Sequence, residues 1–253
     1  MTKLFIPKGQ TLFIAIVTFN SRKHIIDCLL SLKKVRARVK MVIVDNGSTD
    51  RIGNFQFPAS NFQFIQNKKN LGFAAGSNVG IKYALKHGAT HVLLLNPDTI
   101  VGKNFLEPLL ENGGDIVGPV GGRVNFLLGR PKHTTGRVDF ISGACMLVKR
   151  EVFEKVGYLD ERFFLYFEDV DFCLRAKKAG FLISVVPQSH VVHHTPIDVD
   201  KPFVSNLHLL KSNFIFINRW VPLTARPFAY FYWFALSSKI LLEYILKWIL
   251  HKS

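Results

Sequence analysis

Three apolar runs that each stop at a polar residue limit the folds open to this chain more than any other feature. They are "TLFIAIVTFN" (11–20), "KMVIVDNGSTD" (40–50) and "HVLLLNPDT" (91–99). Such runs are typical of strands buried on both faces of a sheet. A helical pattern follows the first run from a candidate N-cap at Ser21, and another precedes the third run and ends at Gly88. This alternation predicts an α/β fold with a mostly parallel central sheet flanked by helices.

The chain continues the alternation to about residue 195. The further elements that we expect are a strand at 61–67, a strand and short helix at 140–157, a helix at 160–180 and a last strand at 181–187. Residues 113–140 are rich in Gly, Arg and Lys, and there we expect one or two strands and a mobile loop near "GRPKHTTGR". We therefore divide the chain into a domain at 1–202 and a C-terminal helical segment at 203–253.

The C-terminal segment is unusually apolar. No charged residue occurs from 227 to 238, and Lys239, Glu243, Lys247 and His251 then recur every four positions. On a helix these four residues form one polar stripe with apolar residues on all other sides, which is typical of a helix lying at a membrane interface. The uncharged run is shorter than the roughly 20 residues that span a bilayer. The alternative is a helix packed on the domain or on a second subunit, as in a homodimer.

Charge and cysteine content narrow the class of partner. The formal net charge of +15 favours nucleic acid, an acidic membrane surface or a phosphorylated ligand. Basic residues are spread along the chain without an arginine-rich arm, and a nucleic-acid-binding module would leave the acids at strand ends unexplained. The three cysteines are isolated and odd in number, and the N-terminus lacks the apolar region of a signal peptide. We therefore expect a cytoplasmic protein that binds no nucleic acid.

Polar residues follow the ends of several predicted strands and could meet in one crevice, because parallel strands share their carboxyl ends at one sheet edge. Asp45 could cap a turn or accept an N–H from a ligand. Asp98, which follows the rigid Pro97, is a candidate ligand for a hard divalent cation that also binds diphosphate oxygens. Asn96 offers a carbonyl oxygen beside it.

Acidic and histidine residues crowd the end of the predicted domain. On a helix Glu168 and Asp171 share a face, while Asp169 points elsewhere. Neighbouring aromatic residues would raise a carboxyl pKa toward the range useful to a catalytic base. On a strand His193 points away from the side that His194 faces, and one histidine of "SHVVHH" could complete the cation site.

Taken together and in this order, the motifs resemble those of inverting glycosyltransferases of family 2 with the GT-A fold, and most of all the bacterial rhamnosyltransferase-like branch. The resemblance covers about 11–195 and rests on "VTFN", "VDNGSTD", "NLGFAAGSNVGI", "LLLNPDT", "SGACMLVKREVFEKVGYLDERFFLYFEDVDFCLRAKKAG" and "HVVHH". It implies metal-dependent transfer of a sugar from a dTDP-rhamnose-like or UDP-sugar donor to a hydroxyl of a cell-surface glycan. With the apolar segment, it implies a lipid-linked acceptor and a peripheral location on the inner face of the cell membrane.

The resemblance also implies a donor site. Thr18 and Asn20 would border the nucleotide, and Asp45 would bind its base. The residues that match the stretch lining the donor pocket are Asn70, Gly72 and Asn78.

The remaining roles concern the cation and the base. Asp98 would be the metal-binding acid of a DxD-type motif in which Asn96 replaces one acid, and one charge fewer should weaken the binding of Mg²⁺ or Mn²⁺. His193 would contact the cation, with His194 as the alternative.

Asp169 would be the catalytic base, with Glu168 as the competing choice. A catalytically inactive assembly partner is the alternative function, but the intact "EDVD" argues against it.

Overall fold

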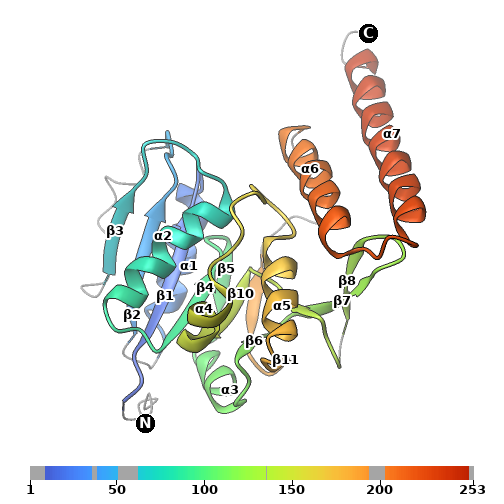
Figure 1. Ribbon diagram of the computed structural model, residues 1–253. Coiled ribbons are helices and arrows are strands. Elements are labelled where there is room, and N and C mark those ends of the chain that lie inside the picture. The colour runs from blue at the N-terminus through green and yellow to red at the C-terminus, as the bar shows by residue number, and fades with distance from the viewer. Residues whose placement is uncertain (1–8, 36–38, 51–61, 135, 194–202, 251–253) are drawn as a thin grey trace.

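A seven-stranded sheet forms the centre of the computed structural model, which describes residues 9–35, 39–50, 62–134, 136–193 and 203–250 (Figure 1). In spatial order its strands are β11 (Ile183–Val185), β6 (Ile116–Gly118), β10 (Cys145–Lys149), β4 (His91–Leu95), β1 (Leu12–Thr18), β2 (Lys40–Asp45) and β3 (Phe62–Gln66). Neighbouring strands run parallel except around β10, which is antiparallel to β4 and β6. The predicted mostly parallel sheet is therefore confirmed.

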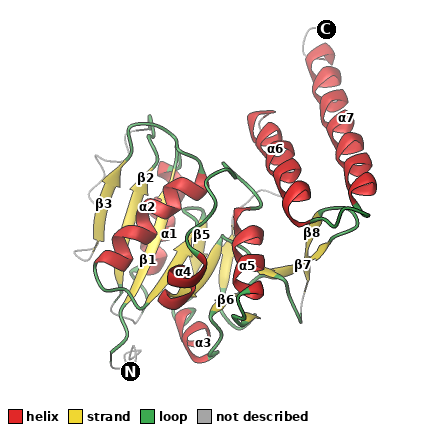
Figure 2. Cartoon of the chain, viewed as in Figure 1, coloured by secondary structure: helices red, strands yellow, loops and turns green. Residues whose placement is uncertain are grey.

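Helices cover both faces of this sheet (Figure 2). One face carries α1 (Arg22–Leu32) and α3 (Leu106–Glu111), and the other carries α2 (Phe73–Lys86), α4 (Arg150–Val156) and α5 (Glu168–Lys178). Within β1, Ile14 packs in the core on the side of α1 and α3, whereas Ala15 and Val17 pack in the core on the side of α2, α4 and α5. This alternation follows from the two-residue period of a strand, and it explains why the run is apolar throughout.

Two smaller sheets complete the fold. β5 (Thr99–Val101) pairs antiparallel with β12 (Val191–His193), and β8 (Arg130–Thr134), β7 (Gly121–Asn125) and β9 (Phe140–Ile141) form a three-stranded sheet. Strands do form in the region where one or two were predicted, but the loop predicted near residues 129–137 is wrong over 130–134, because β8 forms a regular hairpin with β7 there. β8 is exposed at most of its positions, so it lacks the alternating apolar pattern that reveals a half-buried strand.

Ser21 is the N-cap residue of α1, as predicted, but its side chain makes no capping hydrogen bond to the helix. The Ser21 hydroxyl donates to the carbonyl of Phe19 at 3.0 Å instead of binding the helix. The N–H of Arg22 donates to Oδ2 of Asp50 at 2.8 Å, so a residue beyond β2 satisfies the start of this helix.

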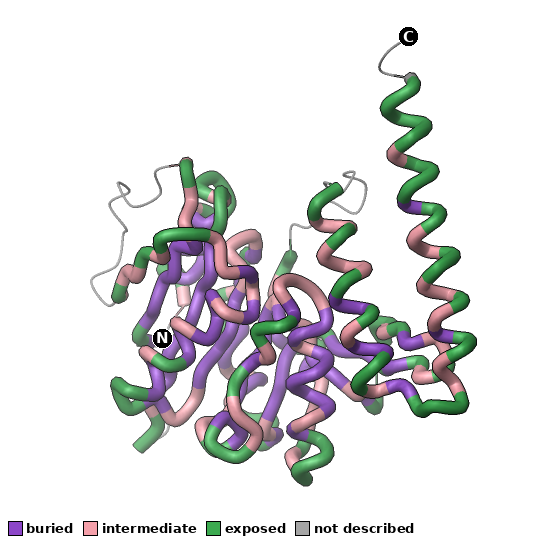
Figure 3. Tube along the Cα trace, turned by 45° about the horizontal axis from the view of Figure 1, so that its top comes forward, coloured by how far each residue is buried: buried purple, intermediate pink, exposed green. Residues whose placement is uncertain are grey.

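Two C-terminal helices, α6 (Phe203–Trp220) and α7 (Arg226–Leu250), stand side by side beyond α5, near the β7–β8 hairpin (Figure 1). α6 packs on the domain, since Phe216 is fully buried in the core that α2, α4 and α5 share. α7 is exposed over most of its length (Figure 3). None of the helices in the described part of the chain is both long and apolar enough to cross a membrane.

Candidate active site

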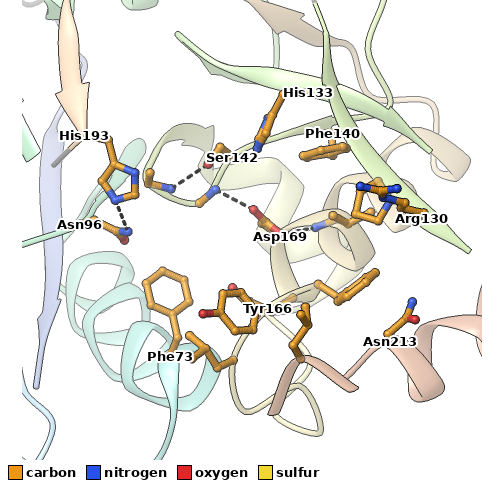
Figure 4. A pocket seen from close by; sticks show the side chains of 18 of the residues that line it. Phe73, Asn96, Arg130, His133, Phe140, Ser142, Tyr166, Asp169, His193 and Asn213 are labelled. Atoms are coloured by element: carbon orange, nitrogen blue, oxygen red, sulfur yellow. Dashed lines mark hydrogen bonds between the residues drawn. The ribbon is translucent and has the colours of Figure 1, made fainter. Parts of the chain in front are cut away.

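A cavity of about 450 Å³ opens where the carboxyl end of β4 meets the start of α5, the β7–β8 hairpin and the C-terminal helices (Figure 4). Four residues predicted for the site line it: Asn96, Glu168, Asp169 and His193. Further lining residues that the sequence analysis did not single out are Arg130, His133, Ser142, Asn213 and Tyr232. The cavity therefore combines a strand-end crevice with walls from elements much later in the chain.

Asp169 lies in the first turn of α5 and carries the most firmly held carboxylate of the cavity. Its Oδ2 accepts the N–H of Gly143 at 2.8 Å, and its Oδ1 accepts the N–H of Val170 at 2.8 Å (Figure 4). Burial raises the pKa of Asp169, and the two hydrogen bonds oppose this rise without cancelling it. A carboxylate with a fixed direction and a raised pKa has the properties of a general base.

Glu168, the neighbouring acid, has different surroundings. It is 5% exposed, and its Oε2 has no hydrogen-bond partner among the described residues. Burial, and then the nearby charge of Asp169, raise the pKa of Glu168 well above its ordinary value. These surroundings favour the protonated form of Glu168 and leave Asp169 as the better-solvated, better-anchored carboxylate.

The backbone before these acids is strained. Tyr166 and Phe167 have φ of 69° and 71°, which places two consecutive non-glycine residues in the left-handed region. Each such residue costs roughly 1–3 kcal/mol, and such strain persists only when surrounding structure enforces it. Here α6 enforces it, since Phe167 packs on Phe216 with ring centroids 5.1 Å apart and Ser212 Oγ donates to the carbonyl of Leu165 at 2.8 Å. α6 thereby fixes the loop that leads into Asp169.

Asp171 turns away from the cavity into the contact between α5 and α6. It is fully buried, and its carboxylate accepts hydrogen bonds from Arg175 Nε and from Trp220 Nε1, both at 2.8 Å. Arg219 Nε lies 3.2 Å from the same carboxylate. This group of contacts ties the two helices together.

A second group of donor atoms lies at the edge of the cavity, where β5 pairs with β12. His193 Nε2 is 3.0 Å from Asp98 Oδ1. The same nitrogen is 3.2 Å from Asn96 Nδ2, a contact that Figure 4 shows. Burial raises the pKa of Asp98, but the hydrogen bond and charge of His193 outweigh burial, so the net pKa is lowered. Asp98 is therefore ionised and lies beside an imidazole nitrogen.

These atoms fit a divalent cation. Asn96 Oδ1 is buried without a hydrogen-bond partner among the described residues, so an oxygen ligand stands unused beside the Asp98–His193 pair. Carboxylate and amide oxygens suit Mg²⁺ and Mn²⁺. Among the residues that the structure describes, no group of three or more His, Cys, Asp or Glu could hold a metal. His194, the alternative ligand, lies outside the described residues.

Three residues predicted to contact the nucleotide come together at the ends of β1 and β2. Thr18 is opposite Asp45 in the strand register, and its Oγ1 is buried without a partner among the described residues. Asp45 is 1% exposed and accepts the N–H of Ser48 at 3.0 Å and Nε2 of Gln66 at 3.1 Å. Asp45 therefore caps the turn, as the structural alternative predicted. Asn20 lies close by and donates its N–H to Ser48 Oγ at 2.9 Å.

Asn46, which the sequence analysis did not single out, organises the next turn of this region. Its Nδ2 donates to Asn70 Oδ1 at 3.0 Å and to the carbonyl of Gly72 at 2.9 Å. Its Oδ1 accepts from Asn67 Nδ2 at 3.0 Å and from the N–H of Leu71 at 3.2 Å. The feature of the sequence that could have identified Asn46 is its position directly after the predicted strand.

Gly72 and Asn78 do not line the cavity. Gly72 has φ of +86°, and a Cβ there would lie 2.5 Å from the carbonyl oxygen of Phe164, so only glycine fits this close approach. The buried amide of Asn78 donates to the carbonyl of Leu159 and to Glu161 Oε1, both at 2.9 Å. These residues hold α2 against the segment that leads to Asp169.

Comparison with known proteins agrees with this architecture. Two family models match, Glycosyl transferase family 2 over residues 13–117 and Glycosyltransferase like family 2 over residues 127–207, and together they cover most of the chain. The dTDP-rhamnosyl transferase RfbF of Shigella flexneri is 28% identical over 207 residues, 73% of this chain and 69% of that protein. The N-acetylglucosaminyl-diphospho-decaprenol L-rhamnosyltransferase of Mycobacterium tuberculosis is 28% identical over 253 residues, 79% of this chain and 82% of that protein.

A solved structure shows the same fold. The mannosyltransferase PcManGT from Pyrobaculum calidifontis, in complex with GDP-Man and Mn²⁺, superposes with a TM-score of 0.60 at 15% identity, over 96% of this chain and 80% of that chain. The sheet order, the strand-end cavity and this superposition define an α/β protein of the GT-A fold. The chain belongs to glycosyltransferase family 2 and is similar to the rhamnosyltransferases of that family. The family and fold inferred from the motifs are confirmed.

Proposed function

We propose that this glycosyltransferase moves a sugar, with inversion, from a nucleoside diphosphate sugar to a hydroxyl of a lipid-linked glycan in cell-surface polysaccharide synthesis. The observation that carries the proposal is the Asp169 carboxylate, which two backbone N–H groups aim into the cavity. Asn96 and His193 line the same cavity. The names of the rhamnosyltransferase relatives support a dTDP-rhamnose-like donor, with a UDP-sugar as the other choice.

In the proposed reaction, an acceptor hydroxyl attacks the anomeric carbon from the side opposite the leaving diphosphate. Asp169 removes the hydroxyl proton as the new bond forms, a role worth roughly 10²–10⁴-fold in rate. The Gly143 N–H keeps Oδ2 of Asp169 in place during the transfer. Glu168, whose burial favours its protonated form, is not itself the base. A single displacement of this kind inverts the anomeric centre and requires no nucleophilic residue.

We propose that Asp98, His193 and Asn96 hold Mg²⁺ or Mn²⁺ together with the donor diphosphate. When bound, such a cation neutralises the charge that develops on the leaving group, a contribution of several kcal/mol. The partnerless Oδ1 of Asn96 and the short Asp98–His193 distance support this assignment. The Mn²⁺ in the PcManGT complex is consistent with it.

At the nucleotide end, we propose that Thr18, Asn20 and Asp45 border the ribose and base. An ionised carboxylate has about four lone-pair sites, and Asp45 uses two of them within the chain. A base would reach Asp45 once the Gln66 side chain moves aside.

The other residues predicted for the donor pocket are buried in contacts within the chain. We propose that Asn70, Gly72 and Asn78 shape this pocket through those contacts and do not touch the donor.

We also propose that the protein is peripheral on the inner face of the cell membrane and binds there through its C-terminal helices. Phe228, Phe231 and Phe234 of α7 are 59%, 77% and 66% exposed, although phenylalanine is normally buried. Large exposed apolar side chains beside a basic protein body suit an anionic lipid surface. A membrane location brings the active site close to a lipid-linked acceptor.

The test is transfer by the purified full chain with Mn²⁺, a set of nucleoside diphosphate sugars and a short prenyl diphosphate-linked glycan. We expect one donor to give a product whose new glycosidic bond has the anomeric configuration opposite to that of the donor, as measured by NMR. A product with the donor's configuration would refute the single displacement. Donor binding without transfer to any acceptor would favour a catalytically inactive assembly partner.

A further inference from the structure

We propose that Arg130 of the β7–β8 hairpin binds the diphosphate of a prenyl-linked acceptor. The end of the cavity next to α7 would then be the site that recognises the acceptor lipid. This inference rests on the proposed function and names the group that the acceptor end selects.

The order of groups along the cavity is the first support. In Figure 4, the Asn96–His193 pair lies on one side of Asp169, and Arg130 lies on the other. If the donor diphosphate occupies the Asn96–His193 side, an acceptor hydroxyl at Asp169 leaves the rest of the acceptor pointing toward Arg130. The reducing end of a lipid-linked glycan carries its diphosphate, so this part of the acceptor would meet the guanidinium.

The electrostatic surroundings of Arg130 are the second support. Its guanidinium carbon lies 5.6 Å from the centroid of the Tyr232 ring, which holds it by a cation–π contact. The described residues offer no carboxylate in a salt bridge with Arg130. A planar guanidinium without an acidic partner is the group best suited to bind phosphate oxygens in a bidentate manner.

The hairpin position of Arg130 is fixed by α6. Asn213 Nδ2 donates to the carbonyl of Gly129 at 2.8 Å, immediately before Arg130 in the chain. Gly129 has φ of +60°, and a Cβ there would lie 2.7 Å from the Ile217 side chain, so the hairpin end sits tightly against this helix. The backbone that carries the Arg130 side chain is therefore held in place by α6.

The wall beside Arg130 indicates the rest of the ligand. Leu209 of α6 and Leu236 of α7 line the same cavity. One cation next to apolar side chains matches a molecule with an anionic head and a hydrocarbon chain, because burying the chain against these side chains removes apolar surface from water. A soluble glycan without a lipid would leave these leucines without a partner.

The experiment measures binding of farnesyl diphosphate to the full chain by titration calorimetry, with the donor site filled by excess nucleoside diphosphate and Mn²⁺. We expect Arg130→Gln to weaken binding about 10- to 100-fold, the value of a lost charge-assisted hydrogen bond. The affinity of Arg130→Lys should lie between those of the wild type and Arg130→Gln, since lysine keeps the charge but lacks the planar guanidinium. Lys132→Gln, on the same strand but outside the cavity lining, should bind like the wild type. Farnesol should bind more weakly and equally to all variants.

Three results would overturn the proposal. Equal affinity of wild type and Arg130→Gln for farnesyl diphosphate would show that Arg130 does not contact the phosphate. An equal loss of farnesol binding would show general damage to the cavity. Arg130-dependent binding of phosphatidylglycerol vesicles or of inorganic diphosphate, with none of farnesyl diphosphate, would assign the residue to a membrane headgroup or to free phosphate. Failure of the proposed function is distinct, because it would abolish sugar transfer and leave the Arg130-dependent binding intact.

Discussion

Glu168 and Asp169 are adjacent carboxyl groups that the fold places in opposite surroundings. Asp169 receives N–H groups from Gly143 and Val170, whereas Oε2 of Glu168 has no partner among the described residues. The sequence shows the acids, but the Gly143 N–H comes from the loop between β9 and β10, about 26 residues away. A local pattern therefore could not distinguish the two carboxyl groups, and the preference for Asp169 as the proposed base came from the family resemblance.

Glu168 should make the stability of the protein depend on pH. Its pKa is raised above the unfolded value of 4.5, so the stabilising proton is fully present below about pH 4.5 and is lost as pH rises through the folded pKa. In Glu168→Gln the side chain stays neutral as the pH rises. We expect the Tm of Glu168→Gln to rise relative to that of the wild type between pH 5 and pH 8. The corresponding gain in unfolding free energy is about 1.4 kcal/mol per unit of pKa shift.

Thermal denaturation at the two pH values checks this prediction. Glu111→Gln, at an exposed position of α3, is the matched control and should show the same pH dependence as the wild type. A constant Tm difference between Glu168→Gln and the wild type at both pH values would contradict the assigned environment of Glu168.

Asp98 should control binding of the metal. Asp98→Asn removes the negative charge beside His193 and Asn96, so we expect Mn²⁺ affinity in the presence of a nucleoside diphosphate to fall at least about 10-fold. Electron paramagnetic resonance of free Mn²⁺ measures this affinity without any turnover. Asp27→Asn, exposed on α1, is the control. Identical Mn²⁺ titrations of the two variants would exclude Asp98 as a ligand.

At the scale of elements, α6 is the part that joins the C-terminal helices to the active site. It bonds to the loop before Asp169 through Ser212, to the hairpin through Asn213 and to α5 through Trp220. All three contacts reach residues at least 47 positions earlier. The helix therefore supports both the strained turn at Tyr166 and the wall of the cavity.

Ser212→Ala should test this support. The change leaves the carbonyl of Leu165 without its partner, which costs about 1–3 kcal/mol and loosens the turn that aims Asp169. We expect a Tm lower by roughly 2–12 °C and a fall in kcat with donor affinity unchanged. Ser237→Ala is the control, because Ser237 Oγ donates to the carbonyl of Trp233 within its own helix at 2.8 Å. Equal kcat values for both variants would show that α6 does not position the base.

The strands that could be predicted are those with long, continuous apolar runs. β1, β2 and β4 are buried on both faces, so their apolar runs are unmistakable. β8 is exposed and basic, so its pairing with β7 was missed. The contacts of α6 could not be predicted either, because a serine or asparagine on a helix gives no sign of a partner far away in the sequence.

At the scale of the whole molecule, the exposed phenylalanines of α7 should determine membrane binding. Replacing Phe228, Phe231 and Phe234 together by serine removes roughly 1 kcal/mol of burial each, so affinity for anionic vesicles should fall about 100-fold. Vesicle sedimentation measures this affinity, and added salt should weaken binding of the wild type.

The control for this triple variant is a second triple variant with serine at exposed leucines elsewhere, namely Leu30, Leu127 and Leu182. It should bind vesicles like the wild type. Equal vesicle affinities for the two triple variants would show that α7 is not the membrane contact, and a dimer formed through α7 would then be sought by sedimentation.

The central claim is that one carboxylate, at Asp169, draws the acceptor proton in a cavity that already holds the donor. The direct measurement compares donor affinity and transfer rate in Asp169→Asn, with Glu168→Gln beside it. We predict unchanged donor affinity in both variants, a transfer rate about 10²–10⁴-fold lower in Asp169→Asn and a much smaller change in Glu168→Gln. Near wild-type transfer by Asp169→Asn would contradict the account.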